Sequence, residues 1–98
     1  MRQLKIITSP AADNDIRRQV QRYLSVANAD IAHQFVDAVR SAYELLAFQP
    51  IGPYRDFGDN QLKGVRTYCI RMLPGYMIAY RANETEIRIE RLLRFRNS

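Results

Sequence analysis

The chain has 98 residues, of which 47% are hydrophobic and 26% are charged, and its formal net charge is +5. This length and balance predict one soluble globular domain, residues 1–98, whose core needs no disulfide or metal. The single cysteine, Cys69, excludes a disulfide framework and indicates a reducing, cytoplasmic setting. The only early apolar run, Ile6-Ile7, is too short for a signal peptide or a membrane span.

The positive charge lies mainly in the second half of the chain. Residues 1–50 hold six basic and five acidic groups, whereas residues 51–98 hold nine and five. Thirteen of the fifteen basic residues are arginine, whose guanidinium group pairs with carboxylates and phosphates through two parallel hydrogen bonds. This pattern favours a macromolecular partner, either a nucleic acid or an acidic protein. The alternative is a solvated basic face that binds nothing.

The first half of the chain predicts a short strand and two amphipathic helices. The strand covers Arg2–Thr8, and Ser9-Pro10 then supplies a capping side chain and a residue suited to the first helical position. Apolar residues at three- and four-residue spacing predict a helix over Pro10–Val26. Asn28-Ala29-Asp30 breaks the pattern and offers new capping residues, after which a second apolar stripe predicts a helix that ends before Pro50. Helices joined by so few residues form an antiparallel hairpin that can cover one face of a sheet.

The second half predicts an irregular stretch followed by three antiparallel strands. Residues 51–62 form the irregular stretch, in which Tyr54 and Phe57 are expected to pin the chain to the body of the protein. β-branched and aromatic residues then predict strands over Val65–Met72, Tyr76–Arg81 and Glu86–Leu93. Leu73-Pro74-Gly75 has the chemistry of a turn between the first two. We expect Cys69 to be a small buried residue of the first strand.

The strand over residues 76–81 is apolar on both sides of its pleat, which predicts a central strand that is covered twice. In the last strand, Ile87, Ile89 and Leu93 are expected to point inward. The predicted fold class is therefore α+β, with the order strand, helix, helix and three strands, and with the helical hairpin packed on one face of a small antiparallel sheet. The other face would expose aromatic and apolar groups among arginines, and such patches mark partner sites.

The sequence contains no motif for a metal, a cofactor or covalent catalysis. One histidine, His33, and one cysteine cannot form a zinc site. No glycine-rich phosphate loop follows a strand, and no serine stands in a nucleophile-elbow motif. We therefore predict no cofactor, no metal and no catalytic residue, and we expect His33 to be a surface or capping side chain.

Short motifs follow one another in a characteristic order along nearly the whole chain. They are Ser9–Asp13, Phe35–Ala38, Leu45-Leu46, Phe48–Gly52, Gly64–Arg66, Gly75-Tyr76, Ala79–Arg81 and Arg91–Leu93. As an ordered set they resemble the ParE branch of the RelE/ParE superfamily, the toxin halves of bacterial type II toxin-antitoxin modules. The resemblance implies the RelE/ParE fold, a ParD-like antitoxin that wraps and neutralises the toxin in a hetero-oligomer, and no membrane partner.

The ParE branch acts on DNA gyrase and blocks replication, so the resemblance implies gyrase inhibition by binding. RelE members instead cut messenger RNA on the ribosome, with basic residues and a late tyrosine or histidine. Here Arg94 stands at the position of the late histidine, Phe95 replaces the glycine after it, and no tyrosine or histidine follows Tyr80. Arginine stays protonated and is a poor general base, which favours a binding protein over an enzyme. The open alternatives are a RelE-like ribosome-dependent endoribonuclease and an inactive, antitoxin-binding relative.

The resemblance and the arginine excess together predict two sets of contact residues. The target-binding residues are expected to be Arg66, Tyr80, Arg81, Arg91, Arg94 and Arg96. The antitoxin-binding residues are expected to be Tyr68, Tyr76 and Ile78. At least two of the last three arginines are expected to project from one pleat face, near Arg66 if the family's strand order holds. We expect the antitoxin to be an acidic, amphipathic segment that folds onto the sheet and the helical hairpin.

Overall fold

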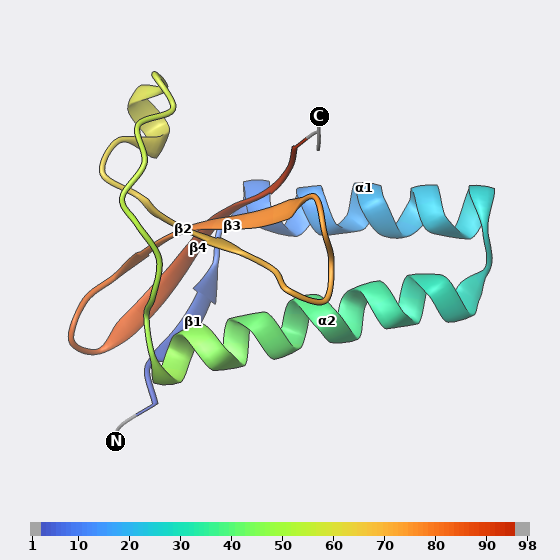
Figure 1. Ribbon diagram of the computed structural model, residues 1–98, viewed down its shortest axis with the longest axis horizontal. Coiled ribbons are helices and arrows are strands. Elements are labelled where there is room, and N and C mark those ends of the chain that lie inside the picture. Colours follow the sequence, from blue (N-terminus) through green and yellow to red (C-terminus); the bar gives the residue numbers. More distant parts are fainter. Residues whose placement is uncertain (1–2, 96–98) are drawn as a thin grey trace.

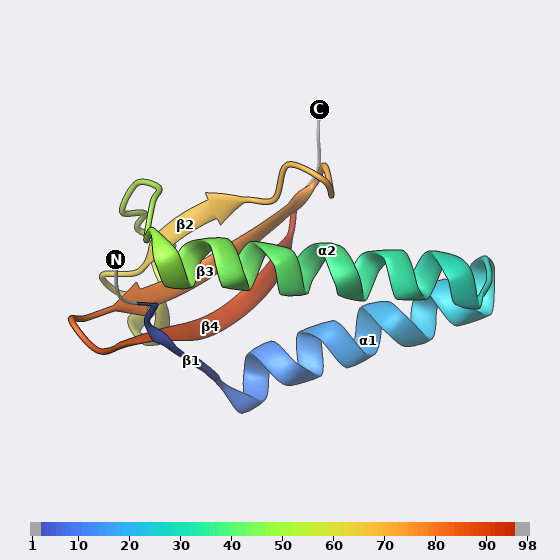
Figure 2. The same cartoon turned by 90° about the horizontal axis from the view of Figure 1, so that it is seen from below.

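A four-stranded sheet, whose strands lie in the order β1 (Lys5–Thr8), β4 (Glu86–Arg94), β3 (Tyr76–Ala82) and β2 (Arg66–Cys69), carries two long helices on one face (Figures 1 and 2). The structure is a computed structural model that describes residues 3–95. Its elements are β1 (Lys5–Thr8), α1 (Pro10–Val26), α2 (Ala29–Phe48), the 3-10 helix η1 (Asn60–Leu62), β2 (Arg66–Cys69), β3 (Tyr76–Ala82) and β4 (Glu86–Arg94). The element order and the helical hairpin on the sheet confirm the predicted fold class.

The sheet is mixed, because its first strand is not antiparallel to its neighbour. β3 pairs antiparallel with both β2 and β4, as expected. β1 instead pairs parallel with β4, with Ile6 opposite Ile87 and Thr8 opposite Ile89. A parallel pair of strands needs a crossover connection. Here residues 9–85, which begin with the helical hairpin, connect β1 to β4. The expectation of a wholly antiparallel sheet is therefore wrong for β1.

Both helices begin at the capping residues that the sequence predicts. The hydroxyl of Ser9 accepts a hydrogen bond from the amide of Ala12 at 3.0 Å, and Oδ1 of Asn28 accepts one from the amide of Ile31 at 2.9 Å. The Ser9 hydroxyl also donates to the carbonyl of Glu90 at 2.7 Å. One side chain therefore both starts α1 and ties that start to β4.

β3 lies in the middle of the sheet and is buried on both faces, as its sequence predicts. Its alternate side chains enter the main core beneath the helices, together with residues of α2 and β4. The largest members of this core are Phe35, Tyr43, Leu46, Tyr76, Ile78, Tyr80, Ile87 and Ile89. The hydrophobic stripes of the helices and the inward face of the sheet thus meet where the periodicity places them.

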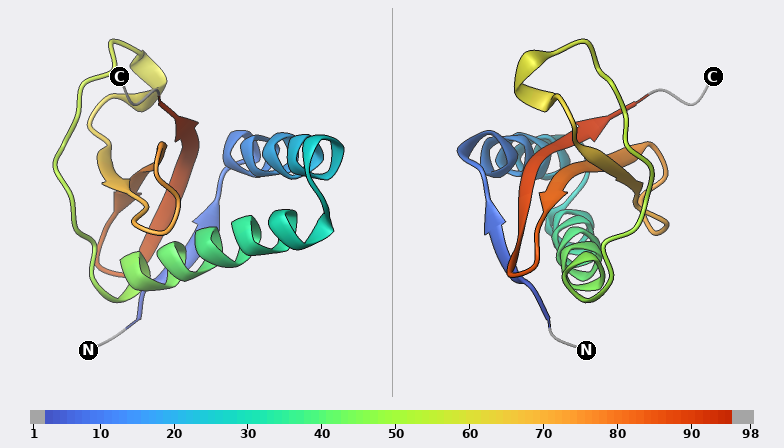
Figure 3. Two further views of the ribbon diagram at one scale, coloured as in Figure 1. Left: turned by 45° about the vertical axis from the view of Figure 1, so that its right-hand side comes forward. Right: turned by 90° about the vertical axis from the view of Figure 1, so that its left-hand side faces the viewer.

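The segment of residues 49–65, between α2 and β2, covers the opposite face of the sheet (Figure 3). It passes around the edge of β2, where the amide of Arg55 donates to the carbonyl of Val65 at 3.0 Å and the amide of Thr67 donates to the carbonyl of Pro53 at 2.9 Å. A second small core follows, made of Leu62, Val65 and Ala79 with Phe57 and Leu93 packed against it. The expectation of an uncovered apolar face is therefore wrong, because this segment supplies the second cover.

A β-bulge in β4 changes which of its residues face the main core. Ala79 pairs with Arg91 and Tyr80 pairs with Ile89, so Glu90 is the extra residue between them. Beyond the bulge the alternation shifts by one position. Leu92 enters the main core and Leu93 packs in the second core, so the inward position predicted for Leu93 is wrong.

The region around β2 is more exposed than the sequence indicates. β2 ends at Cys69, and residues 70–75 form the connection to β3 instead of extending the strand to Met72. Cys69 is exposed, since it ends an edge strand, and the expectation that it is buried is wrong. Tyr54 is exposed as well, so Phe57 alone of the two aromatic residues pins the segment before β2.

Candidate interaction surfaces

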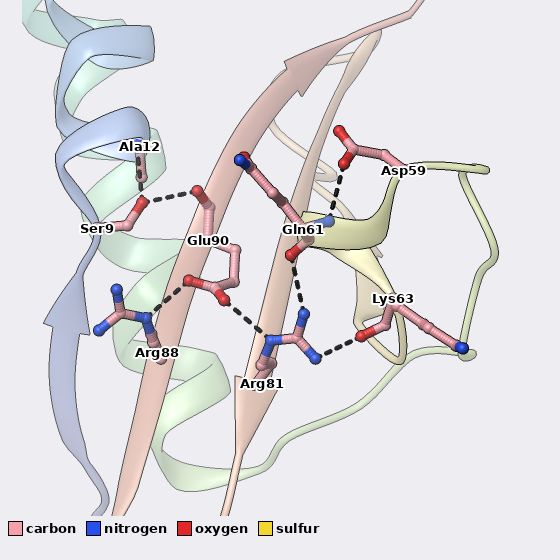
Figure 4. A network of polar contacts seen from close by, with 8 residues as sticks. All are labelled: Ser9, Ala12, Asp59, Gln61, Lys63, Arg81, Arg88 and Glu90. Carbon is pink, nitrogen blue, oxygen red and sulfur yellow. Dashed lines mark hydrogen bonds and ion pairs between the residues drawn. The ribbon is translucent and has the colours of Figure 1, made fainter.

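Arg81 of β3 holds the segment of residues 49–65 against the sheet (Figure 4). Its Nη1 donates to the carbonyl of Lys63 at 2.5 Å, and its Nη2 donates to the carbonyl of Gln61 at 3.0 Å. Its Nε forms an ion pair with Glu90 at 2.9 Å. All three nitrogens of this guanidinium group therefore make internal bonds. Arg81 is expected to contact a target only through the part of its side chain that stays exposed, and its main contacts are structural.

Glu90, the extra residue of the bulge, lies between two arginines (Figure 4). Its Oε2 accepts from Arg81, and its Oε1 accepts from Nε of Arg88 at 2.8 Å. The carboxylate is mostly shielded, whereas about half of the Arg88 side chain is exposed. The bulge thus places one carboxylate where it offsets the repulsion between the two guanidinium groups.

Arg91 is bound to Asp15 of α1 through a bidentate ion pair. Nε of Arg91 lies 2.7 Å from Oδ2 of Asp15, and Nη2 lies 2.9 Å from Oδ1. The amide of Leu92 donates to the same Oδ2 at 3.0 Å. The hydrogen bond to Asp15 raises the pKa of Arg91 above its usual value. This predicted target residue therefore fastens α1 to β4.

Arg66 and Tyr80 face each other across β2 and β3. Tyr80 is completely buried, its hydroxyl donates to the carbonyl of Ile51, and burial raises its pKa. It therefore presents no atom to a target. Nε of Arg66 donates to the carbonyl of Gly52 at 3.0 Å, and its guanidinium group lies over the rings of Tyr54 and Tyr80. Arg66 is partly exposed and remains a candidate contact.

Tyr68, Tyr76 and Ile78 all lie on the sheet face that the helices cover. Tyr76 and Ile78 are buried, and Tyr68 packs against the same core from the edge strand. The hydroxyl of Tyr76 bonds to the hydroxyl of Tyr23 and to Oε1 of Gln19, both at 2.9 Å. Burial, followed by the bond to Tyr23, raises the pKa of Tyr76. In this fold Tyr76 and Ile78 are core residues, and Tyr68 is the most exposed of the three.

Arg94 is exposed at the end of β4, with its guanidinium carbon 5.9 Å from the centre of the Tyr76 ring. Arg96 lies outside the described residues. Arg94 pairs with Tyr76 in the sheet register, whereas Arg66 pairs with Tyr80, which lies four residues farther along β3. The expected proximity of the last arginines to Arg66 is therefore wrong for Arg94, because the register separates them.

The far end of the helical hairpin carries an apolar surface that the sequence analysis did not identify. Both helices extend past the sheet (Figures 1 and 2), so part of their apolar stripes has nothing to cover. Leu24, Val26 and Ile31 are exposed there. A hollow of about 210 Å³ lies beside them, lined by Val20, Leu24, Ala29, Ala32, His33 and Val36. Comparing element lengths could have suggested it, since helices of 17 and 20 residues span about 26 and 30 Å, whereas the four-residue strands β1 and β2 span only about 13 Å.

Two kinds of site are absent from the described part of the chain. Among residues 3–95, no three histidine, cysteine or acidic side chains are grouped so that they could hold a metal ion. Within the same range no helix has the length and apolar character that crossing a membrane requires.

Comparison with known proteins identifies a family and a similar solved structure. The family model described as "ParE toxin of type II toxin-antitoxin system, parDE" matches residues 6–97. The solved structure described as "Chromosomal ParDE TA system from P. aeruginosa" contains a similar chain, with a TM-score of 0.78 and 20% sequence identity over 96% of this chain and 98% of that one. No curated protein sequence matches. At this identity the structural match establishes the fold alone, and the family model carries the assignment.

Proposed function

Since the chain belongs to the ParE toxin family of type II toxin-antitoxin systems, we propose that it inhibits DNA gyrase by binding, and that a ParD-like antitoxin neutralises it. The reaction of the RelE branch would need a general base near the basic residues. Tyr80 is the last tyrosine of the chain, and no histidine follows it. Its hydroxyl is buried, donates to Ile51 and has a raised pKa. This engagement of Tyr80 is the observation that supports binding over RNA cleavage.

The target contact is assigned to the end of β4 and the residues after it. The guanidinium groups of Arg81 and Arg91 form hydrogen bonds within the protein, and Tyr80 is buried. Arg94 is exposed, within residues 3–95 it forms no ion pair, and Arg96 follows it in the sequence. A partner's carboxylates or phosphates would relieve the repulsion between such neighbouring charges. We therefore expect Arg94 and Arg96 to make the principal contacts, with Arg66 as a secondary one.

A gyrase supercoiling assay beside a ribosome-dependent RNA cleavage assay tests the mode of action. The purified protein should inhibit supercoiling and leave messenger RNA intact. Substituting both Arg94→Ala and Arg96→Ala should weaken inhibition by about 1–3 kcal/mol, the range for lost charged interface contacts. The control removes the same charge from the helices through Arg17→Ala and Arg40→Ala, both exposed. RNA cleavage with normal supercoiling would reverse the proposal in favour of an endoribonuclease. Normal supercoiling together with intact messenger RNA would point to an inactive relative.

The antitoxin is expected to cover the apolar end of the helical hairpin. Leu24 and Val26 expose 52% and 72% of their surface there, and Leu24 also lines the neighbouring apolar hollow. The basic character of the chain favours an acidic partner segment, and a segment that is disordered alone gains its order by burying such residues. These features support an antitoxin site on the hairpin, in place of the one expected at Tyr76 and Ile78.

The affinity of the purified toxin for its cognate antitoxin tests this placement. Substituting both Leu24→Ser and Val26→Ser should weaken the complex, because the antitoxin then buries less apolar surface. Met72→Ser is the matched control, since Met72 is as exposed but lies in the turn between β2 and β3. Full affinity in the double variant combined with loss in Met72→Ser would place the antitoxin on the sheet side.

A further inference from the structure

A small hollow lies between α1 and the end of β4, apart from the apolar surface of the hairpin. Its volume is about 180 Å³, and its polar lining comes from Asp15, Arg18, Gln19, Tyr76, Arg91 and Arg94. Pockets that enclose a whole small-molecule ligand are larger, about 300–1,000 Å³. The hollow therefore has room for one compact polar group of a ligand, with the remainder of that ligand outside.

The charged groups of this hollow leave it with a net positive charge. Three guanidinium groups line it, against the single carboxylate of Asp15. Both oxygens of that carboxylate already accept hydrogen bonds from Arg91, and one also accepts from the amide of Leu92. Among residues 3–95 neither Arg18 nor Arg94 forms an ion pair. Two uncompensated cations thus face the same small space.

Internal contacts hold three of the donors of the hollow, those of Arg91, Arg94 and Gln19, in place. Asp15 fixes Arg91 through Nε and Nη2, and Nη1 makes no hydrogen bond to the described residues. Arg94 lies over the ring of Tyr76. Oε1 of Gln19 accepts from the hydroxyl of Tyr76, which leaves the amide nitrogen of Gln19 free to donate. Donors that are already ordered lose little further entropy when an anion binds.

We propose that this hollow is a binding site for a single phosphate group, held by Arg18, Arg94 and the free Nη1 of Arg91, with Gln19 as a neutral donor. Guanidinium forks match the oxygens of phosphate, and the excess of two positive charges suits a dianion better than a carboxylate. The phosphate comes either from the free ion or from the backbone of a nucleic acid. The proposal does not depend on gyrase inhibition, because it concerns the binding of an anion to the isolated chain.

Titration of the purified protein with inorganic phosphate at constant ionic strength, followed by NMR of the arginine Nε–H groups, tests the site. Saturable shifts are expected for Arg18, Arg91 and Arg94, and sodium acetate at the same ionic strength should produce much smaller ones. Arg18→Ala should weaken phosphate binding by about tenfold, as expected for one charged hydrogen bond. The control is Arg17→Ala, which removes the same charge from the adjacent position of α1, outside the hollow.

A short single-stranded oligonucleotide distinguishes the two sources of phosphate. Binding of the oligonucleotide that Arg18→Ala weakens and Arg17→Ala does not would identify a nucleic-acid backbone as the source, and binding of inorganic phosphate alone would identify the free ion. Equal losses in both variants, or shifts that acetate reproduces in full, would overturn the proposal. These titrations contain no gyrase, so a failure here and a failure of gyrase inhibition are separate results.

Discussion

Asp15 is the one charged side chain that is buried within residues 3–95. It accepts two hydrogen bonds from Arg91 and one from the amide of Leu92, so it satisfies the backbone directly after the bulge of β4. A shielded carboxylate with this many donors is specific in geometry, because both of its oxygens must be placed correctly. Two elements from opposite ends of the sequence are joined at this residue.

Asp15→Asn is expected to lower the free energy of unfolding by about 2–3 kcal/mol, because it leaves the Arg91 guanidinium without its counter-charge while keeping the side-chain shape. Urea denaturation measures the change. Asp13→Asn, in the exposed first turn of the same helix, should change stability by less than about 0.5 kcal/mol. Similar losses in both variants would mean that the charge of the helix start, and not the contact with Arg91, is what matters.

Gly52 is a second residue whose role comes from tertiary contact. Its φ angle is +110°, and a Cβ atom at this position would lie 1.8 Å from the carbonyl oxygen of Thr67. The close approach lets the segment after α2 turn around the edge of β2. Gly52→Ala is therefore expected to destabilise the protein by about 1–3 kcal/mol through backbone strain, more if the segment detaches.

Thermal unfolding of Gly52→Ala beside Gly58→Ala checks this expectation. Gly58 also has a positive φ, +73°, but a Cβ atom there would meet nothing within 4 Å. The difference between the two variants therefore isolates the contact with β2. Equal melting temperatures would show that the carbonyl of Thr67 can move away.

At the scale of elements, the segment of residues 49–65 acts as a third layer over the sheet. It has little regular structure of its own, and it stays in place through the second core and the bonds from Arg81. An apolar sheet face thus receives a cover from a stretch that the sequence marks as a loop. On the other face, the helical hairpin extends past the end of the sheet, so part of it covers no strand (Figure 2).

Arg81→Gln is expected to loosen this segment without unfolding the sheet, because it removes the bonds to the carbonyls of Gln61 and Lys63. The loss should be about 1–2 kcal/mol. Amide hydrogen exchange is expected to speed up at Arg55 and Leu62, whose amides bond within the segment or to its end, and to stay slow in β3. Arg88→Gln is the matched control, since it breaks the other bond to Glu90 and touches no carbonyl of the segment. Faster exchange in both variants would assign the effect to Glu90.

At the scale of the whole molecule, three buried tyrosines link stability to high pH. Burial raises the pKa of Tyr43, Tyr76 and Tyr80 above their ordinary value of about 10. In the unfolded chain these groups lose their protons near pH 10, whereas in the folded protein they keep them to higher pH. The stabilisation of the folded state by these protonated tyrosines is therefore complete below about pH 10 and is lost as pH rises further.

The free energy of unfolding is accordingly expected to fall with rising pH above about pH 10, with tyrosinate absorbance appearing as the protein unfolds. Urea titrations at several alkaline pH values measure the slope. Tyr43→Phe should make the slope shallower, and it should not reduce stability at neutral pH, because the Tyr43 hydroxyl has no hydrogen-bond partner among the described residues. A slope that is unchanged in this variant would contradict the assignment to buried tyrosines.

The sequence by itself determined the local features of this protein: the α1 and α2 ranges with their Ser9 and Asn28 caps, the central position of β3, and the family motifs. These follow from side-chain periodicity and capping, which act within a few residues. The tertiary structure alone decided the parallel pairing of β1, the bulge at Glu90, and the cover supplied by residues 49–65. It also decided that half of the six predicted target residues, Tyr80, Arg81 and Arg91, make internal contacts. These features depend on contacts between residues that are far apart in the sequence, such as Asp15 and Arg91, and local sequence patterns do not predict such contacts.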